Sequence, residues 1–502
     1  VNPLNKLGFA IARENEGNIK ITELGNQFLK GEYDIGDIFF KSLLKLQFPN
    51  PWSKDFSKKD NFDIVPFIAT LHLMNEVNRK SDKNGLSKDE FCFFVPTLIN
   101  FKDINKQCER ILEYRRSKNK REFLIKFAEE FYEGPTTKTK INNLYDYGDN
   151  TMRYFRLTRF FSVSTNPLGQ YWEIDTSKSR AIEIEELTNM YDGSSFKFTS
   201  LNDYLTYLSD ITKPELPWEK KEKLLEIALT LKDSILKIAE SNNIKLNAAE
   251  QFVILVDFSK LNKEELENEI KILRQINLSI KEKINKAVLV SNSQAIENII
   301  LNLKNIKILK KYDPEQFEKC ISDAFKIIND EIQIKPNFPV DDNGEPISHS
   351  PGNKPDIECY YESFKAIVEV TLNSSSLQWV QEGQPVMRHL RYFEKQNKNS
   401  DVFCIFIAPK IHNDTYSTFW TAVKYEYDGA PQKIVPLRSE QFAILLENLL
   451  KLLKKNKRYS HHDLYKLYSI IVNGTKNLSS YSGWETSIQE NLLRWSKELE
   501  ER

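Results

Sequence analysis

The stretch Lys354–Leu372, KPDIECYYESFKAIVEVTL, decides the fold of the carboxy-terminal part of this chain. β-Branched and aromatic residues dominate both ends of the stretch, and the residues between them are typical of a tight turn, so two adjacent strands are predicted. Because side chains alternate along a strand, Glu369 and Thr371 share one face of the second strand. We expect that face to meet Asp356, at the beginning of the first strand.

Two carboxylates that converge at the end of a sheet suit Mg²⁺, which prefers oxygen ligands and keeps positions open for water and a phosphate oxygen. Asp356 and Glu369 are therefore candidate ligands for one or two Mg²⁺ ions. Such a site hydrolyses phosphodiesters through metal-activated water. Acidic residues also occur in purely structural strands, so two acids alone are weak evidence for a metal site. The residues around them decide between the two interpretations.

The residues after the second strand bring positive charge toward the two acids. Pro385 fits the first turn of a helix that would carry Arg388, His389 and Arg391. Positive charge beside paired carboxylates favours a phosphate substrate, so Arg388 is a candidate DNA contact. Glu382, just before this helix, could supply a third acid.

A fourth acid is predicted on an earlier helix. Asp313-Pro314 has the pattern of an N-cap followed by proline at the first helical position, and Glu318 follows on that helix. Glu318 and Glu382 would help to hold a metal or orient the attacking water. His389 would contact the scissile phosphate or assist proton transfer. The candidate catalytic residues are Glu318, Asp356, Glu369, Glu382 and His389.

Several motifs around these acids carry a family resemblance. They are Phe317-Glu318, the run His349–Asp356 (HSPGNKPD), Glu369-Val370-Thr371, Glu382, Pro385–His389 (PVMRH), Cys404–Pro409 (CIFIAP) and Ile434–Leu437 (IVPL). Together they resemble the cleavage domain of AlwI-type IIS restriction endonucleases, a group within the PD-(D/E)xK nuclease superfamily that includes site-specific nicking endonucleases. The resemblance extends into the amino-terminal half through Thr151–Arg156 and Pro214–Pro217.

The resemblance implies that the amino-terminal region recognises a short asymmetric site in double-stranded DNA. It also implies that the carboxy-terminal region cleaves a few base pairs away with Mg²⁺. One active site cuts one strand, so double-strand cleavage would need a transient homodimer or a separate small catalytic subunit. Thr371 stands where the wider superfamily usually has lysine.

Composition narrows the classes of function. The 502 residues are enough for two or three domains, and 71 basic residues balance 71 acidic ones, so DNA binding must rest on local patches. Five cysteines without a CxxC pair indicate a reduced cytoplasmic compartment and disfavour a zinc site. We expect no membrane span, since no apolar run approaches the ~20 residues that one needs. We expect no nucleotide cofactor, since no glycine-rich nucleotide-binding loop occurs. The first residue is Val1, so we expect a truncated amino terminus.

The amino-terminal region is predicted to be mostly helical with winged-helix modules. Strand patterns at Gly8–Ala12 and Ile19–Thr22, around a turn at Glu14–Asn18, precede helices that begin near Leu24 and Asp34. A second helix-and-hairpin pattern ends in Phe161–Val163 and Tyr171–Ile174, with a loop at Thr165–Gly169. In a winged helix the helix enters the major groove and the hairpin touches the backbone.

Two basic segments of this region are candidate DNA contacts. Lys102–Lys126 is predicted as one charged helix that carries Arg115 and Arg116, although a solvated helix face explains the charge equally well. Arginines also recur every three residues and form a basic stripe if they lie on one helix. These are Arg153, Arg156 and Arg159, and their alternative is to pair with Glu183, Glu185 and Glu186 of the following helix.

The overall prediction is an α+β chain whose helical recognition region precedes an α/β PD-(D/E)xK nuclease core. Residues 1–135 and 136–200 form two recognition subdomains, and a proline-containing linker covers 201–218. The cleavage domain covers 219–502, with a helical part at 219–310 and the nuclease core at 311–502. Asp341–Gly344 has the pattern of a hairpin turn.

Two other functions fit the same residues. A DNA-binding regulator could retain the nuclease-like domain as an inert scaffold, because a fold does not guarantee its chemistry. An RNA-processing nuclease would share the metal site and differ in substrate alone. Four carboxylates and a histidine near one sheet edge favour the DNA endonuclease over the scaffold, since unpaired buried carboxylates cost stability.

Overall fold

The computed structural model describes residues 2–11, 18–31, 34–50, 61–165 and 171–501. Two compact units make up the chain. Unit 1 comprises Val1–Ser164, Tyr171–Ile280 and Asp341–Glu345, and unit 2 consists mainly of Lys281–Val340 and Pro346–Arg502. The turn expected at Glu14–Asn18 and the loop expected at Thr165–Gly169 lie largely outside the described residues.

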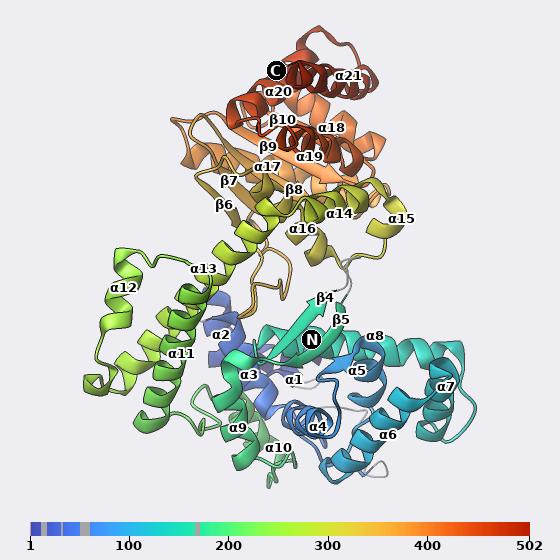
Figure 1. Cartoon of the computed structure of the whole chain (residues 1–502). Coiled ribbons are helices and arrows are strands. Elements are labelled where there is room, and N and C mark those ends of the chain that lie inside the picture. Colours follow the sequence, from blue (N-terminus) through green and yellow to red (C-terminus); the bar gives the residue numbers. More distant parts are fainter. Residues whose placement is uncertain (1, 12–17, 32–33, 51–60, 166–170, 502) are drawn as a thin grey trace. The chain divides into compact units, whose positions relative to one another are not determined.

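Unit 1 is mostly helical (Figure 1). Its helices are α1 (Asn2–Lys6), α2 (Glu23–Lys30), α3 (Ile35–Lys45), α4 (Pro66–Lys80), α5 (Lys88–Phe94), α6 (Ile104–Arg116), α7 (Lys120–Phe131), α8 (Lys138–Leu157), α9 (Ala181–Met190), α10 (Leu201–Ser209), α11 (Lys221–Ser241) and α12 (Ala248–Leu255). The long helix α13 (Lys263–Ser291) begins in this unit. A mostly helical amino-terminal region agrees with the sequence prediction.

Two small sheets complete unit 1. Strands β1 (Ala10–Ile11) and β2 (Lys20–Ile21) form the predicted antiparallel hairpin. The second sheet places β5 (Tyr171–Thr176) between β4 (Phe161–Thr165) and β3 (Leu86–Ser87). Strand β3 was not predicted, because its short apolar pattern runs directly into the capping box that starts α5.

The predicted charged helix at Lys102–Lys126 is in fact two helices. Helix α6 ends at Arg116, and α7 begins at Lys120 after a short break. The Asn119 side chain accepts a hydrogen bond from the backbone N–H of Glu122, which caps α7. Asparagine is a strong N-cap residue, so a new helix start at this point outweighs the continuous charge pattern.

The boundary between the units lies inside α13, after Ile280, and not in the expected linker at 201–218. The residues of that linker include helix α10, which belongs to unit 1. Ion pairs explain why the following helices join the same unit. Lys223 of α11 contacts Glu186 of α9 at 2.9 Å, and Arg274 of α13 pairs with Glu183 of α9.

The turn at Asp341–Glu345 also belongs to unit 1. It is the predicted tight turn, with the Gly344 N–H donating to the Asp341 carbonyl at 3.1 Å. Arg180 contacts the carboxylate of Asp342 at 3.0 Å, and Arg274 lies 3.7 Å from it. Burial opposes ionisation of Asp342, but the two guanidinium groups outweigh it and lower its pKa to about 2.

Unit 2 is built on one mixed five-stranded sheet in the order β10-β9-β8-β7-β6 (Figure 1). Its strands are β6 (Gln333–Pro336), β7 (Ile357–Tyr360), β8 (Lys365–Val370), β9 (Val402–Ala408) and β10 (Ile434–Arg438). Pairs β6–β7 and β7–β8 are antiparallel, whereas β8–β9 and β9–β10 are parallel. The two strands predicted within Lys354–Leu372 are β7 and β8, and the edge strand β6 was not predicted.

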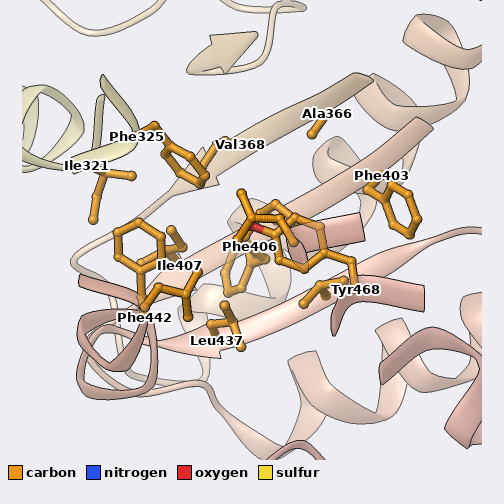
Figure 2. Close-up of a cluster of buried hydrophobic side chains, with 14 of the residues drawn as sticks. Ile321, Phe325, Ala366, Val368, Phe403, Phe406, Ile407, Leu437, Phe442 and Tyr468 are labelled. Atoms are coloured by element: carbon orange, nitrogen blue, oxygen red, sulfur yellow. The ribbon is translucent and has the colours of Figure 1, made fainter. Parts of the chain in front are cut away.

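Helices cover both faces of this sheet. Those that contact its strands are α16 (Pro314–Ile328), α17 (Gln384–Gln396), α18 (Asn413–Lys424), α19 (Ser439–Leu453) and α20 (His461–Gly474). The other helices of the unit, α14 (Ser293–Lys304), α15 (Ile306–Leu309) and α21 (Tyr481–Glu500), pack against helices. Figure 2 shows Phe325 of α16 beside Val368 of β8, and Phe442 of α19 beside Ile407 of β9. On the opposite face, Phe406 of β9 packs against Phe419 of α18, with ring centroids 5.1 Å apart.

None of the helices in the described part of the chain combines the length and apolar character that crossing a bilayer requires. The five cysteines are free thiols, and four of them are buried. Burial raises the pKa of Cys92 to about 12, so its thiol is unreactive near neutral pH.

We expect Phe325→Ala to destabilise unit 2 by about 3–5 kcal/mol, because it removes a large side chain from a closed core. Phe325 is 1% exposed and its ring packs at a tilt against Phe442, with the ring centroids 5.1 Å apart. Urea unfolding followed by circular dichroism measures the loss. Leu493→Ala is the matched control, since Leu493 is 52% exposed and its truncation should cost less than about 0.5 kcal/mol. Equal losses in both variants would contradict this packing.

Candidate active site

Asp356 and Glu369 lie opposite each other at one end of the β7–β8 pair. The antiparallel register joins Ile357 to Val368, so the next position along each strand brings the two acids together. The backbone N–H of Val370 donates to Oδ2 of Asp356 at 2.7 Å, which fixes that carboxylate. The alternation seen in the sequence thus places both acids on the face opposite Val368.

Glu318 and Glu382 join this pair, as the charge interactions of the four acids show. The pKa of Asp356 is raised well above its ordinary value by burial first, then by the charges of Glu369 and Glu318, with a smaller effect from Glu382. Burial also raises the pKa of Glu369 strongly, and Glu382 and Glu318 add to the rise. We call these four residues, Glu318, Asp356, Glu369 and Glu382, the acidic cluster.

Glu382 reaches the acidic cluster from a π-helical turn, Trp379–Gly383, that leads into α17. The sequence placed this residue just before the helix, whereas the turn makes it part of a continuous helical segment. π-Helical turns of this kind often occur at functional sites. Burial raises the pKa of Glu382, and a hydrogen bond from Thr371 partly offsets the rise.

His389 approaches the acidic cluster from α17. Its Nδ1 lies 2.8 Å from Oε1 of Glu369, at hydrogen-bond distance. Its Nε2 is buried and has no hydrogen-bond partner within the described residues. Burial and then the charge of Arg388 lower the pKa of His389. A buried ring nitrogen without a partner beside an acidic cluster is suited to a substrate atom or a water.

The two arginines of α17 have different surroundings. Arg388 is exposed, and its charge acts on His389. Arg391 instead donates to Glu394 and to the backbone carbonyl of Ala430, both at 2.6 Å. It also donates to the carbonyl of Tyr427. Arg391 therefore stabilises the fold of unit 2, and the expectation that it adds positive charge beside the acids is wrong.

The acidic cluster offers carboxylate oxygens, the type of ligand that hard divalent cations prefer. Among the residues that the structure describes, no group of three His, Cys, Asp or Glu side chains could by itself hold a metal ion. Mg²⁺ does not require three, because it usually binds one or two carboxylates and retains several waters. Burial and then the charges of neighbouring acids raise the pKa values of Asp356 and Glu369, and a bound dication would favour their charged forms.

His349 contacts the acidic cluster, although sequence reasoning assigned it no role. Its Nδ1 lies 3.0 Å from Oε1 of Glu318. Ser350, the next residue, donates to Oε2 of Glu318 at 3.4 Å and to the backbone carbonyl of Asp356 at 3.3 Å. The run His349–Asp356 carried part of the family resemblance, but nothing in its spacing indicates that it folds back onto α16.

Three of the candidate DNA-binding arginines of unit 1 make ion pairs within it. Arg115 contacts Glu90 at 2.9 Å, Arg153 contacts Asp149 at 2.9 Å, and Arg159 contacts Asp34 at 3.0 Å. None of these partners is one of the acids of α9 that the sequence suggested. The expected stripe is also interrupted, because α8 ends at Leu157, before Arg159.

The exposure of these arginines differs as much as their pairing. Arg156 is buried, with 1% of its surface exposed, so it could reach DNA only if unit 1 opened locally. Arg116, at the carboxy-terminal end of α6, is exposed. Arg153 keeps 39% of its side chain exposed in spite of its ion pair. Of the candidates in unit 1, Arg116 and Arg153 are the most accessible to a phosphate.

Comparison with known proteins gives one match over most of the chain. A family model described as AlwI restriction endonuclease matches residues 5–445. Among solved structures, the chain is similar to the small subunit of a heterodimeric restriction endonuclease, with 21% sequence identity and a TM-score of 0.33. That similarity covers 39% of this chain and 98% of the subunit. No curated protein matches the sequence.

We expect Asp356→Asn to stabilise the metal-free protein, and more strongly as the pH rises. An acid whose pKa is raised by folding favours the folded state at low pH, and this contribution is lost as the pH rises through the raised pKa. The uncharged amide of asparagine cannot ionise, so the variant does not lose this stability as the pH rises. The gain should be small at about pH 4 and reach about 1 kcal/mol or more near pH 8. Thermal unfolding in EDTA measures it.

Glu362→Gln is the control for this pH dependence, since Glu362 is exposed in the turn between the same two strands. Its thermal midpoint should follow that of the parent at every pH. A stabilisation by Asp356→Asn that does not change with pH would contradict the raised pKa.

Proposed function

This chain belongs to the AlwI restriction endonuclease family, and from that premise we propose that it is a type IIS restriction endonuclease or nicking endonuclease. It recognises a short asymmetric sequence in double-stranded DNA and hydrolyses a phosphodiester bond a few base pairs outside it, with Mg²⁺. The acidic cluster carries this proposal, because burial and then the charges of neighbouring acids raise the pKa values of Asp356, Glu369 and Glu382, and such a site calls for a cation.

In this proposal Asp356 and Glu369 hold the metal, one or two Mg²⁺ ions. When bound, Mg²⁺ supplies Lewis-acid stabilisation of the phosphate and lowers the pKa of a water. Glu318 and Glu382 lie close enough to affect the same charges, so they orient the attacking water or complete the metal's surroundings.

The basic side chains of α17 act on the phosphate in the same proposal. His389 offers its unpartnered Nε2 to the scissile phosphate or to a proton in transfer, while Nδ1 is held by Glu369. Arg388 is exposed next to it and offers its charge to a phosphate oxygen.

We assign DNA recognition to unit 1. Helix α8 is followed by β4 and β5, and β5 also pairs with β3, which is the order of elements in a winged helix. Arg116 and Arg153 are accessible there, and phosphate contacts of this kind fix the register of a protein on duplex DNA. Arg115, Arg156 and Arg159 support the recognition surface from within the unit in this assignment.

A single acidic cluster can cleave one strand. A double-strand break would therefore require a second copy of this chain in a transient homodimer, or a separate small catalytic subunit. Sequencing of both strands after digestion separates these possibilities from nicking, since it gives the recognition site, the offset and the strand that is cut.

A DNA-binding regulator with an inert nuclease-like scaffold is the alternative. Buried carboxylates that are not neutralised cost stability, so a scaffold without metal chemistry would gain by losing them. An EDTA-sensitive cleavage assay on plasmid DNA distinguishes the two functions. Parallel incubation with RNA tests whether the substrate is DNA.

We expect Glu369→Gln to abolish Mg²⁺-dependent cleavage and to leave DNA binding in EDTA unchanged. The amide keeps the shape of the side chain and removes the negative charge that a metal needs. Single-turnover cleavage of plasmid and a gel-shift titration measure the two effects. Glu362→Gln, in the exposed turn of the same strand pair, should cleave like the parent. Parental cleavage by Glu369→Gln would refute the assignment.

We expect Arg116→Ala to weaken DNA binding to a similar degree for all sequences and to reduce the slope of log Kd against log salt by about 1. The reason is that an exposed arginine that contacts phosphate releases one counterion. Fluorescence anisotropy over a salt series measures the slope. Lys454→Ala, an exposed change in unit 2, serves as the control. An unchanged slope for Arg116→Ala would remove this residue from the DNA surface.

A further inference from the structure

Two histidine–glutamate pairs flank the acidic cluster, and one of them has no role in the function proposed so far. His389 contacts Glu369 through Nδ1 at 2.8 Å, and His349 contacts Glu318 through Nδ1 at 3.0 Å. The two histidines come from different parts of unit 2, α17 and the segment that leads to Asp356. In both pairs the same ring nitrogen meets a carboxylate that is almost fully buried.

The surroundings of His349 are not those of a core residue. Its side chain is 49% exposed, whereas the side chain of its partner Glu318 is 7% exposed. An exposed imidazole contributes little to core packing, so the main constraint that it imposes comes from its contacts with two buried carboxylates. Its Nδ1 meets Glu318, and its Nε2 lies 3.8 Å from Oε2 of Glu315. A carboxylate held by a fixed donor keeps one orientation, which is how outer residues align the ligands of a metal site.

The contact also connects two distant parts of the acidic cluster. Glu318 lies on α16, and His349 stands seven positions before Asp356 in the chain. Ser350 extends the connection, since its hydroxyl lies within 3.4 Å of Glu318 and 3.3 Å of the Asp356 carbonyl. His349 and Ser350 thus connect α16, which carries Glu318, to Asp356, the residue before β7.

We propose that His349 is a positioning residue for hydrolysis, whose Nδ1–H donates to Glu318 and holds that carboxylate toward Asp356 and Glu369. This inference rests on the proposed nuclease function and deepens it. His349 acts through Glu318 and does not touch the substrate. Its loss lowers the rate of cleavage and leaves the affinity for DNA unchanged.

Three substitutions of His349 separate positioning from other roles. Asparagine places an amide N–H where Nδ1–H stands in histidine, whereas glutamine places its amide farther out, near the position of Nε2. We expect His349→Ala and His349→Gln to lower the single-turnover cleavage rate by about 10–100-fold, and His349→Asn to retain most of the parent's rate. The dissociation constant for DNA in EDTA should be the same for all three.

Each other outcome overturns the inference. Equal loss in all three variants would make His349 a general acid or base, and a weaker affinity for DNA would make it a phosphate contact. Equal parental rates would leave it without a role. If His349→Ala does not fold, as judged by its thermal midpoint, the cleavage rates of His349→Asn and His349→Gln still test the inference.

Controls distinguish this inference from the proposed function. His462→Ala, an exposed histidine on α20, should cleave like the parent. If the parent cleaves DNA with Mg²⁺ and Glu369→Gln does not, the proposed function holds, and the His349 series is decisive for the inference alone. If the parent fails to cleave any DNA with Mg²⁺, the proposed function and the inference fail together.

Discussion

Repulsion among four acids, of which Glu318 and Glu369 are buried and Asp356 and Glu382 are half-buried, is the constraint on which the rest of unit 2 depends. Charged groups of one sign do not remain together in a low-dielectric site unless the surrounding structure holds them there. Here the β7–β8 register fixes Asp356 opposite Glu369, and the Val370 N–H and His389 each hold one carboxylate. The closed cores on both faces of the sheet provide the stability that offsets the repulsion.

The strands and acids near Asp356 were predictable because their signals are local. Alternation along Lys365–Val370 sets the face of Glu369, and a proline marks the start of the helix that carries Glu318. The contact between His349 and Glu318 spans 31 positions and depends on how a segment without regular structure folds back. No periodicity encodes such a return, so sequence reasoning quoted His349 within a motif and missed its partner.

The arginines of unit 1 show a different limit of sequence reasoning. A three-residue spacing predicts a common face only while the helix continues, and α8 ends between Arg156 and Arg159. Arg156 turns into the core, whereas Arg159 pairs with Asp34, which lies 125 positions away. Charge along a sequence therefore does not distinguish a DNA-binding surface from internal ion pairs, particularly in a chain whose net charge is zero.

Thr371 stands beside the acidic cluster at the position where the sequence resemblance leads one to expect a lysine. A lysine at that position would place a positive charge beside the acids and offset part of their repulsion. Burial raises the pKa of Glu382, and threonine offsets this rise only in part, through a hydrogen bond without a charge. Of the cationic side chains of α17, Arg391 is bound to Glu394 and backbone carbonyls, and Arg388 is exposed. The acidic cluster therefore has less positive charge beside it than one with a lysine would have.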